Sequence, residues 1–120
     1  MLNEDRIFLH VYGIRQCDST RHALKFLDTR KVPHQFHDFR EEGVDGALLK
    51  RWLESAHGEY LMNRRSTTWR GLSEKEKQAA NDDPLPTLLA HPTLIKRPVI
   101  TDGDVILEVG FSPSSLEDYI

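Results

Sequence analysis

The spacing of apolar and polar positions predicts a strand, a helix and a second strand in the first third of the chain. Residues Ile7–Tyr12 are rich in β-branched and aromatic side chains and stop at Gly13, which predicts a buried strand. A helix is expected from Arg21 to Lys31, after Asp18–Thr20, which are cap-type or first-turn residues. Gln35–Phe39 predicts a second, short strand. This order is typical of a βαβ unit with parallel strands and a right-handed crossover.

The middle of the chain reads as a group of helices. Arg40–Gly46 is expected to be a charged loop, after which Asp45 begins a helix with one apolar stripe to about Ala56. Ser73 and Glu76 fit the S-x-x-E capping box, so a short helix is expected from there to about Ala80. Leu85–Leu89 predicts another short amphipathic helix.

The last part of the chain predicts a hairpin and a closing helix. Asp102-Gly103 lies between the β-like runs Val99–Thr101 and Asp104–Val109, which is a strong hairpin signal. Ser112-Pro113 then resembles a helix start, with proline at the first helical position, and the last helix is expected to include residues 116–120.

The order of these elements predicts an α/β domain close to a thioredoxin core. We expect one mixed four-stranded sheet, with a helical insertion between its βαβ half and its β-hairpin half. The expected domain spans residues 1–120, with the core at about 6–40 and 93–120 and the insertion at about 45–91.

Composition narrows the class of protein. With 120 residues, 38% of them hydrophobic and 29% charged, the chain suits one folded domain and not a disordered segment. Its longest apolar run is too short to cross a bilayer, and Met1–Arg6 lacks the features of a signal peptide. We therefore expect a cytoplasmic protein that does not bind membranes. A net charge of −3 gives no general reason to expect nucleic-acid binding.

The candidate chemistry centres on Cys17, the single cysteine of the chain. It lies at the expected strand-to-helix turn, where free backbone N–H groups and the helix dipole favour a thiolate, the reactive form. A redox or thiol-transfer site is one interpretation, and a buried structural cysteine is the other. Because one cysteine cannot form an internal disulfide, the second sulfur would come from glutathione, another protein or a second copy of this chain.

Several arginines are candidates for stabilising a thiolate or an anion. Arg15 lies two residues before Cys17, and Arg97 directly precedes Pro98, while solvated surface cations are the alternative for both. Arg64 and Arg65 belong to a polar stretch with three arginines around Trp69; the alternatives there are a solvated helix face and nucleic-acid binding, which the acidic balance disfavours.

Metal and nucleotide sites are not indicated. His34 and His37 are three residues apart in an expected strand and so would lie on opposite faces, and one cysteine cannot form a zinc thiolate cluster. The glycines form neither a P-loop nor a dinucleotide fingerprint. We expect no metal and no tightly bound cofactor.

Three segments, taken together and in this order, resemble the arsenate reductase (ArsC)/Spx family. They are Val11–Ser19, Leu61–Arg70 and His91–Ile100, and the middle one is most similar to the YffB-like branch. The resemblance extends from Ile7 to about Tyr119.

This resemblance implies a thioredoxin-like fold with a helical insertion. It also implies a reactive Cys17, an anion-binding Arg97, and a proline, Pro98, that is commonly cis and faces the turn formed by Cys17, Asp18 and Ser19. The YffB-like branch implies a thiol reductase with glutathione as co-substrate and resolving thiol, and with a thiol protein such as glutaredoxin as a further possible partner.

Two other activities within this family are alternatives. Arsenate reductases have two further arginines near the cysteine; the first aligns with Asn63, beside Arg64 and Arg65, and the second falls near Phe111, where the chain has no arginine. An oxyanion needs several fixed positive charges, so arsenate reduction is disfavoured. The Spx regulators bind RNA polymerase and typically carry C-x-x-C, whereas this chain has Cys17–Thr20 with a single cysteine.

Overall fold

The structure is a computed structural model, and it describes residues 7–120. The described chain forms two compact units. The sheet unit consists of residues 7–42 and 97–120, and the helical unit is Gly43–Lys96. Residues 1–6 lie outside the described part of the chain. They include the segment expected to lack the features of a signal peptide and the first residue of the expected core.

The sheet unit contains one mixed four-stranded sheet, as the sequence predicts. Its strands are β1 (Leu9–Gly13), β2 (His34–Asp38), β3 (Val99–Asp102) and β4 (Val105–Val109), in the order β2-β1-β3-β4. The pairing of β1 with β2 is parallel, and the pairings β1–β3 and β3–β4 are antiparallel. The Asp-Gly hairpin is confirmed, because Gly103 adopts φ +60° in the turn between β3 and β4.

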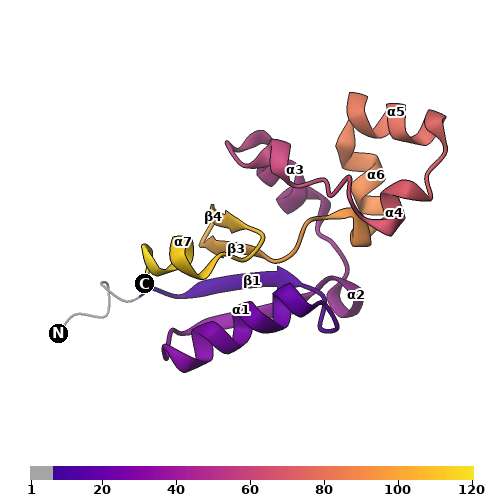
Figure 1. Cartoon of the computed structure of the whole chain (residues 1–120). Coiled ribbons are helices and arrows are strands. Elements are labelled where there is room, and N and C mark those ends of the chain that lie inside the picture. The colour runs from indigo at the N-terminus through magenta and orange to yellow at the C-terminus, as the bar shows by residue number, and fades with distance from the viewer. Residues whose placement is uncertain (1–6) are drawn as a thin grey trace. The chain divides into compact units, whose positions relative to one another are not determined.

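One face of this sheet is covered by helices α1 (Asp18–Thr29) and α7 (Pro113–Glu117) (Figure 1). The apolar side chains that meet there are fully buried and come from both helices and from β1 and β3: Leu9, Val11, Ala23, Leu27, Ile100 and Leu116. Pro113 occupies the start of α7, as expected. Residues more than 80 positions apart thus share one core.

Helix α1 begins at Asp18, earlier than the expected Arg21, so residues 18–20 are first-turn residues and not caps. Cys17 is the N-cap: its backbone is extended, with φ −77° and ψ 125°. The Cys17 carbonyl oxygen accepts the first helical hydrogen bond, from the Arg21 N–H at 3.0 Å. The polar residues after the cysteine therefore form the first turn of the helix.

A short helix, α2 (Phe39–Glu42), replaces part of the expected charged loop. The Asp38 carboxylate accepts a hydrogen bond from the Arg40 N–H at 2.7 Å, which satisfies a free donor at the helix start. Charged composition suggested a loop there, but this capping contact favours a turn of helix.

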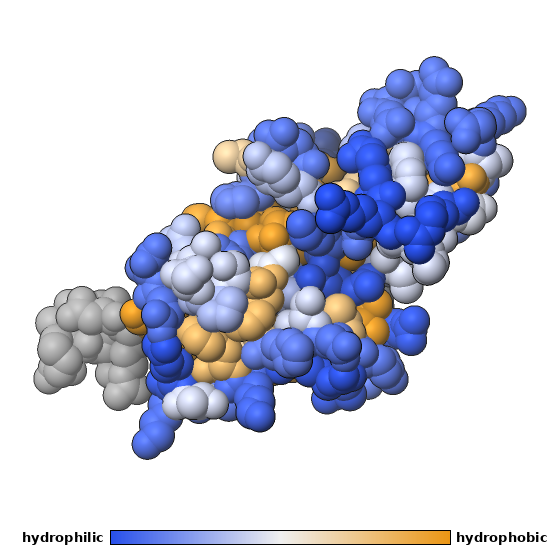
Figure 2. All heavy atoms as spheres, viewed as in Figure 1, coloured by the Kyte–Doolittle hydropathy of each residue, from blue (hydrophilic) through white to orange (hydrophobic). Residues whose placement is uncertain are grey.

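The helical unit is built from four α-helices and two 3₁₀ turns among its described residues: α3 (Gly46–Glu54), η2 (Gly58–Tyr60), α4 (Thr67–Arg70), α5 (Glu74–Asp82), α6 (Pro84–Ala90) and η3 (Pro92–Leu94). The Asp45 carboxylate caps α3, and the predicted Ser73–Glu76 capping box is present at α5. The sequence did not predict α4, which the Ser66 hydroxyl caps. Figure 2 shows that the surface over α5 is predominantly hydrophilic.

Among residues 7–120, the longest helix, α1, has 12 residues, and none is long and apolar enough to cross a membrane.

Candidate functional site

The thiol of Cys17 is fixed at the beginning of α1. The turn Ile14–Gln16 follows β1, and the Cys17 N–H closes it by donating to the Ile14 carbonyl at 2.9 Å. The Cys17 side chain is partly exposed. Its sulfur therefore lies beside the first N–H groups of a three-turn helix, at the positive end of the helix dipole, and remains reachable by a reactant.

Local contacts favour ionisation of this thiol. Partial burial raises the pKa of Cys17, but hydrogen bonds from the backbone N–H and hydroxyl of Thr20 and from the Arg97 side chain, together with the charge of Arg97, more than offset it. The net result is a pKa lowered from the ordinary thiol value. A lower pKa increases the thiolate fraction near neutral pH, and the thiolate is the nucleophile.

Thr20 packs against Gly13, where no side chain would fit beside it. Thr20 is fully buried, and a Cβ added to Gly13 would lie 2.8 Å from the Thr20 Cγ2 and would also clash with its hydroxyl. The sequence pattern did not single out Thr20 as a site residue, although a hydroxyl three residues after a helix N-cap was a usable signal.

Arg97 reaches Cys17 because of the strand register. Tyr12 of β1 pairs with Val99 of the antiparallel β3, so the residues just before β3 lie beside those just after β1. Arg97 is half-buried and Pro98 is buried, and the peptide bond between them is cis. The structure therefore brings together Cys17 and Arg97, which the sequence analysis singled out separately.

The other residues near Cys17 that the sequence singled out, Arg15, Asp18 and Ser19, are exposed. The Arg15 guanidinium lies over the Phe36 ring at 5.2 Å and 3.8 Å from Glu41, and it does not contribute to the pKa shift of Cys17. Asp18 is exposed and forms an ion pair with Arg21, and Ser19 is exposed. A role of Arg15, Asp18 or Ser19 toward a substrate stays a prediction.

Asp38 supports the turn before Cys17, and the sequence analysis did not identify it as a site residue. Its buried carboxylate accepts the Arg15 N–H at 3.0 Å and the Arg40 N–H at 2.7 Å. Burial raises the pKa of Asp38, but backbone hydrogen bonds from Arg40, Arg15 and Glu41 outweigh it and lower the pKa. An aspartate directly after a strand is a common backbone acceptor, which was the available signal.

Arg64 and Arg65 belong to the helical unit. The Arg64 guanidinium donates to the Asn81 Oδ1 at 2.7 and 3.2 Å and lies 5.4 Å from the Trp69 ring. Arg65 is exposed, and its N–H donates to the Asn63 side chain at 3.0 Å. A role of either arginine at Cys17 stays a prediction.

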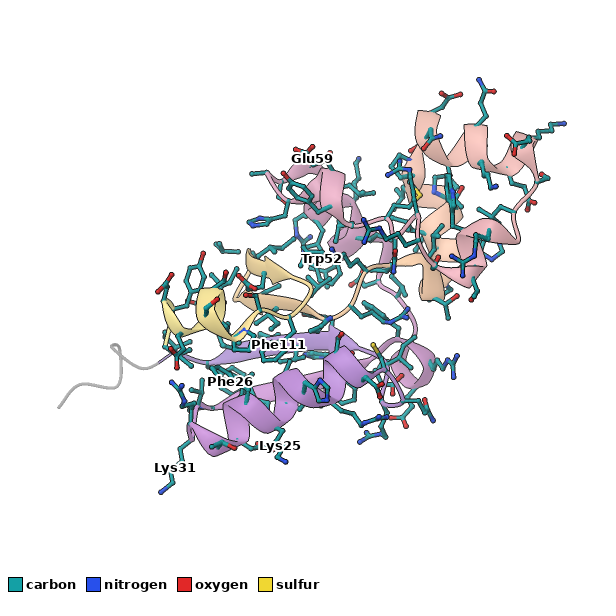
Figure 3. The ribbon with its side chains drawn as sticks, viewed as in Figure 1. Lys25, Phe26, Lys31, Trp52, Glu59 and Phe111 are labelled. Carbon is teal, nitrogen blue, oxygen red and sulfur yellow. The ribbon has the colours of Figure 1, made fainter. Side chains whose placement is uncertain are left out.

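Phe111, near which arsenate reductases are expected to have an arginine, contributes to the core of the sheet unit. Its ring packs edge-to-face on Phe26 of α1, with a centroid distance of 5.6 Å. Figure 3 shows these two rings facing each other, while Lys25 and Lys31 point away from the sheet. This position therefore contributes an apolar contact instead of a cation.

Two histidines, His10 of β1 and His37 of β2, lie side by side on the sheet face opposite α1. The His10 Nδ1 and the His37 Nε2 are 2.9 Å apart, and the His37 Nδ1 is 3.0 Å from Glu42. Among residues 7–120, no three His, Cys, Asp or Glu side chains are grouped so that they could hold a metal ion.

Comparison with known proteins places the chain in a family. The model of the ArsC family matches residues 12–119. The chain belongs to the ArsC family. An uncharacterised protein of Haemophilus influenzae is 40% identical over 104 residues, which are 85% of this chain and 90% of that protein.

Two solved structures support the ArsC fold. A protein named YFFB is 35% identical with a TM-score of 0.84, covering 92% of this chain and 96% of that one. A Brucella melitensis protein described as related to arsenate reductase (ArsC) is 33% identical with a TM-score of 0.73, covering 94% of each chain. The predicted thioredoxin-like fold and family are thus confirmed, and Cys17, Arg97 and Pro98 all fall within the matched range.

Proposed function

We propose that this ArsC-family protein is a thiol reductase in which Cys17 exchanges sulfur bonds with glutathione. The observation that supports this most is the setting of the thiol: a partly exposed cysteine at a helix start, contacted by Thr20 and Arg97, with a lowered pKa. Such a thiolate is a competent nucleophile toward a disulfide. The chain supplies no second thiol, so an external thiol completes the reaction.

The reaction proceeds in two exchanges. The Cys17 thiolate attacks a disulfide, a new S–S bond forms to Cys17, and the displaced sulfur leaves as a thiolate. When the bound group is glutathione, a second glutathione thiolate attacks the glutathione sulfur, oxidised glutathione leaves, and the Cys17 thiolate is restored. For a substrate that is a mixed disulfide with glutathione, the sum of the two exchanges consumes one free glutathione, releases the substrate thiol and forms one oxidised glutathione.

Arg97 would have two functions in this reaction. Its guanidinium stabilises the Cys17 thiolate before attack, and a guanidinium is the side-chain group best matched in shape and charge to a carboxylate such as those of glutathione. A thiol protein such as glutaredoxin would compete with glutathione for the adduct on Cys17. We propose no metal or tightly bound cofactor in either step.

The experiment is intact mass spectrometry after incubation with oxidised glutathione. Because Cys17→Ser removes the one cysteine, its failure to react shows only where the adduct forms, so a second control is needed. That control is the wild-type protein unfolded in urea, in which Cys17 has an ordinary thiol pKa. At slightly acidic pH we expect the folded protein to gain one glutathione faster than the unfolded chain, because a lowered pKa leaves more of the thiol ionised there.

Other outcomes would contradict the proposal. Equal or slower reaction of the folded protein would mean that the fold does not activate Cys17 toward glutathione disulfide. Arsenate-dependent turnover with glutathione and glutaredoxin, without disulfide reduction, would favour an arsenate reductase. Stoichiometric capture of RNA polymerase by a protein that forms no glutathione adduct would favour a regulatory function.

A further inference from the structure

A chain of three polar side chains runs across the sheet face opposite α1. It joins His10 of β1, His37 of β2 and Glu42, the last residue of α2. The His10 Nδ1 lies 2.9 Å from the His37 Nε2, and the His37 Nδ1 lies 3.0 Å from the Glu42 Oε1. Both ring nitrogens of His37 therefore have a partner, and the three residues are not among the groups that shift the pKa of Cys17.

The carboxylate fixes the direction of this chain. A carboxylate only accepts hydrogen bonds, so the proton of a neutral His37 lies on Nδ1 and points at Glu42. The His37 Nε2 then carries a lone pair, and the His10 Nδ1–H donates to it across the 2.9 Å contact. Both imidazoles are thus in the Nδ1–H form, whereas the Nε2–H form predominates in a free histidine side chain. The His10 Nε2 is left as the nitrogen that takes up a further proton.

A first proton enters this chain without breaking it. When the proton binds the His10 Nε2, the Nδ1 proton of His10 passes to the His37 Nε2, and the contact between the rings is kept with its direction reversed. The positive charge then lies on His37, which has the Glu42 carboxylate at 3.0 Å and the stacked Tyr12 ring at a centroid distance of 4.5 Å. His10 stays neutral, as its burial favours.

A second proton does not fit the same geometry. With both imidazoles charged, the two facing nitrogens both carry hydrogens, and no lone pair remains in the 2.9 Å contact. Two positive charges would also lie on rings whose centroids are 5.1 Å apart. The titratable groups facing the pair from the other side chains of the sheet unit are Tyr12 of β1, Glu42 of α2 and Asp102 of β3. Burial, and then the charge of His37, lower the pKa of His10 against the opposing charge of Asp102.

We propose that Glu42, His37 and His10 form a pH-sensitive link between α2, β2 and β1, which takes up one proton with its contacts kept and opens when it takes up a second. This link is separate from the thiol exchange proposed above. Since His37 directly precedes Asp38, which holds the turn before Cys17, the link lies at the strand that supports that turn. Its opening weakens the sheet unit on acidification.

The sign of the effect on stability follows from His10. In the unfolded chain His10 takes up its proton near the ordinary histidine pKa of 6.5, and in the folded chain only at lower pH. The unfolded state therefore binds more protons between these two values. The contribution of the link is present above the unfolded-state pKa and is lost as the pH falls through and below it.

The first test is nitrogen NMR of the imidazole rings in the wild-type protein at pH 8, which distinguishes the Nδ1–H from the Nε2–H form. We expect the Nδ1–H form for both His10 and His37. The exposed His22 of α1 is the internal control and should show the Nε2–H form. An Nε2–H form at His10 would overturn the proposal, because His10 could not then donate to His37.

The second test is urea unfolding at pH 7.5 and pH 5.5 of the wild type, His10→Asn and His22→Asn. The asparagine amide keeps a donor near the position of the His10 Nδ1 but takes up no proton. Both pH values lie above the range in which the Asp38 carboxylate becomes protonated, because the pKa of Asp38 is lowered. The wild type should lose stability between the two pH values, His22→Asn should lose as much, and His10→Asn should lose less.

The change with pH, and not the stability at one pH, is the deciding quantity, because any cost of replacing a strand histidine is present at both pH values. An equal loss in His10→Asn and the wild type would overturn the proposal. So would an equally reduced loss in His10→Asn and His22→Asn, because general repulsion between positive charges would then explain the effect.

Discussion

The ionisation of Cys17 depends on a few opposing effects at the start of α1. Burial of the sulfur disfavours its charge, whereas Thr20 and Arg97 favour it. One pKa unit corresponds to about 1.4 kcal/mol, and a hydrogen bond to a charged group contributes about 1.5–3 kcal/mol. Losing any single donor is therefore enough to change the thiolate fraction measurably.

Arg97 and Arg15 provide a matched pair of cations for testing this balance. Arg97→Ala should raise the midpoint of the Cys17 titration, because it removes both a hydrogen bond and a charge that lower the pKa. Arg15→Ala should leave the midpoint unchanged, because Arg15 contacts Phe36 and Glu41 instead. The measurement is the rate of alkylation by iodoacetamide as a function of pH.

An equal shift in Arg97→Ala and Arg15→Ala would contradict the role given to Arg97. It would show that the overall positive potential around Cys17, and not contact with Arg97, sets the pKa of Cys17. Arg97→Lys adds a finer control. It keeps the charge but loses the planar guanidinium, so an intermediate midpoint is expected.

At the scale of elements, Asp38 joins the end of β2, the turn before Cys17 and the start of α2. Its two carboxylate oxygens accept backbone N–H groups from both segments. Since the pKa of Asp38 is lowered in the folded state, it contributes stability above the unfolded-state pKa. That contribution is lost as the pH falls through the folded-state pKa.

Asp38→Asn should therefore destabilise the protein at neutral pH by about 1–3 kcal/mol, because an amide replaces a charged acceptor of backbone hydrogen bonds. The difference from the wild type should shrink as the pH falls below the ordinary carboxyl range, where the wild-type carboxylate also becomes protonated. Urea unfolding at several pH values measures both effects. Asp104→Asn, at an exposed turn position, is the control and should change little. A destabilisation that is independent of pH would contradict the electrostatic explanation.

Local patterns predicted most elements of the fold because caps and turns are encoded by neighbouring residues. The capping box at Ser73 and the hairpin at Gly103 are examples. The sequence predicted the start of α1 too late and a charged loop in place of α2. Both predictions were wrong because each element begins with a contact that the composition does not reveal. Cys17 acts as an unusual N-cap, and Asp38 satisfies the first N–H groups of α2.

At the scale of the whole molecule, each unit has its own buried residues. The core cluster of the sheet unit comes entirely from residues on either side of the helical unit. The helical unit buries a separate set, including Leu49, Trp52, Leu61 and Leu88. When a chain leaves a folded unit and later returns to it, the entropy cost of closing that loop grows only slowly with the length of the inserted segment. The sheet unit should therefore tolerate loosening of the helical unit.

Gly58→Ala tests this expectation. The added Cβ would lie 2.6 Å from the Leu53 carbonyl carbon, so the helical unit should lose about 3 kcal/mol or more. Hydrogen exchange should then increase across Gly43–Lys96, while β1 and β3 retain most of their protection. Gly71→Ala is the control, because its Cβ would make only ordinary contacts at 3.5 Å. Equal loss of protection in β1 and β3 would show instead that the two units unfold together.

The sequence by itself determined that the protein carries a single thiol. The one cysteine at an expected strand-to-helix turn, and the absence of a second cysteine, are properties of the chain alone. The order of elements and the family resemblance also follow from it, because local periodicity and turn residues depend on neighbours in the chain.

Only the tertiary structure decided which groups surround that thiol. The pairing of Tyr12 with Val99 brings Arg97 to the site, and the absence of a side chain at Gly13 leaves room for Thr20. Such contacts depend on strand register and on space left by an absent side chain, and neither leaves a local pattern in the sequence. The sequence therefore makes Cys17 a candidate reactive thiol, whereas the lowering of its pKa depends on the fold.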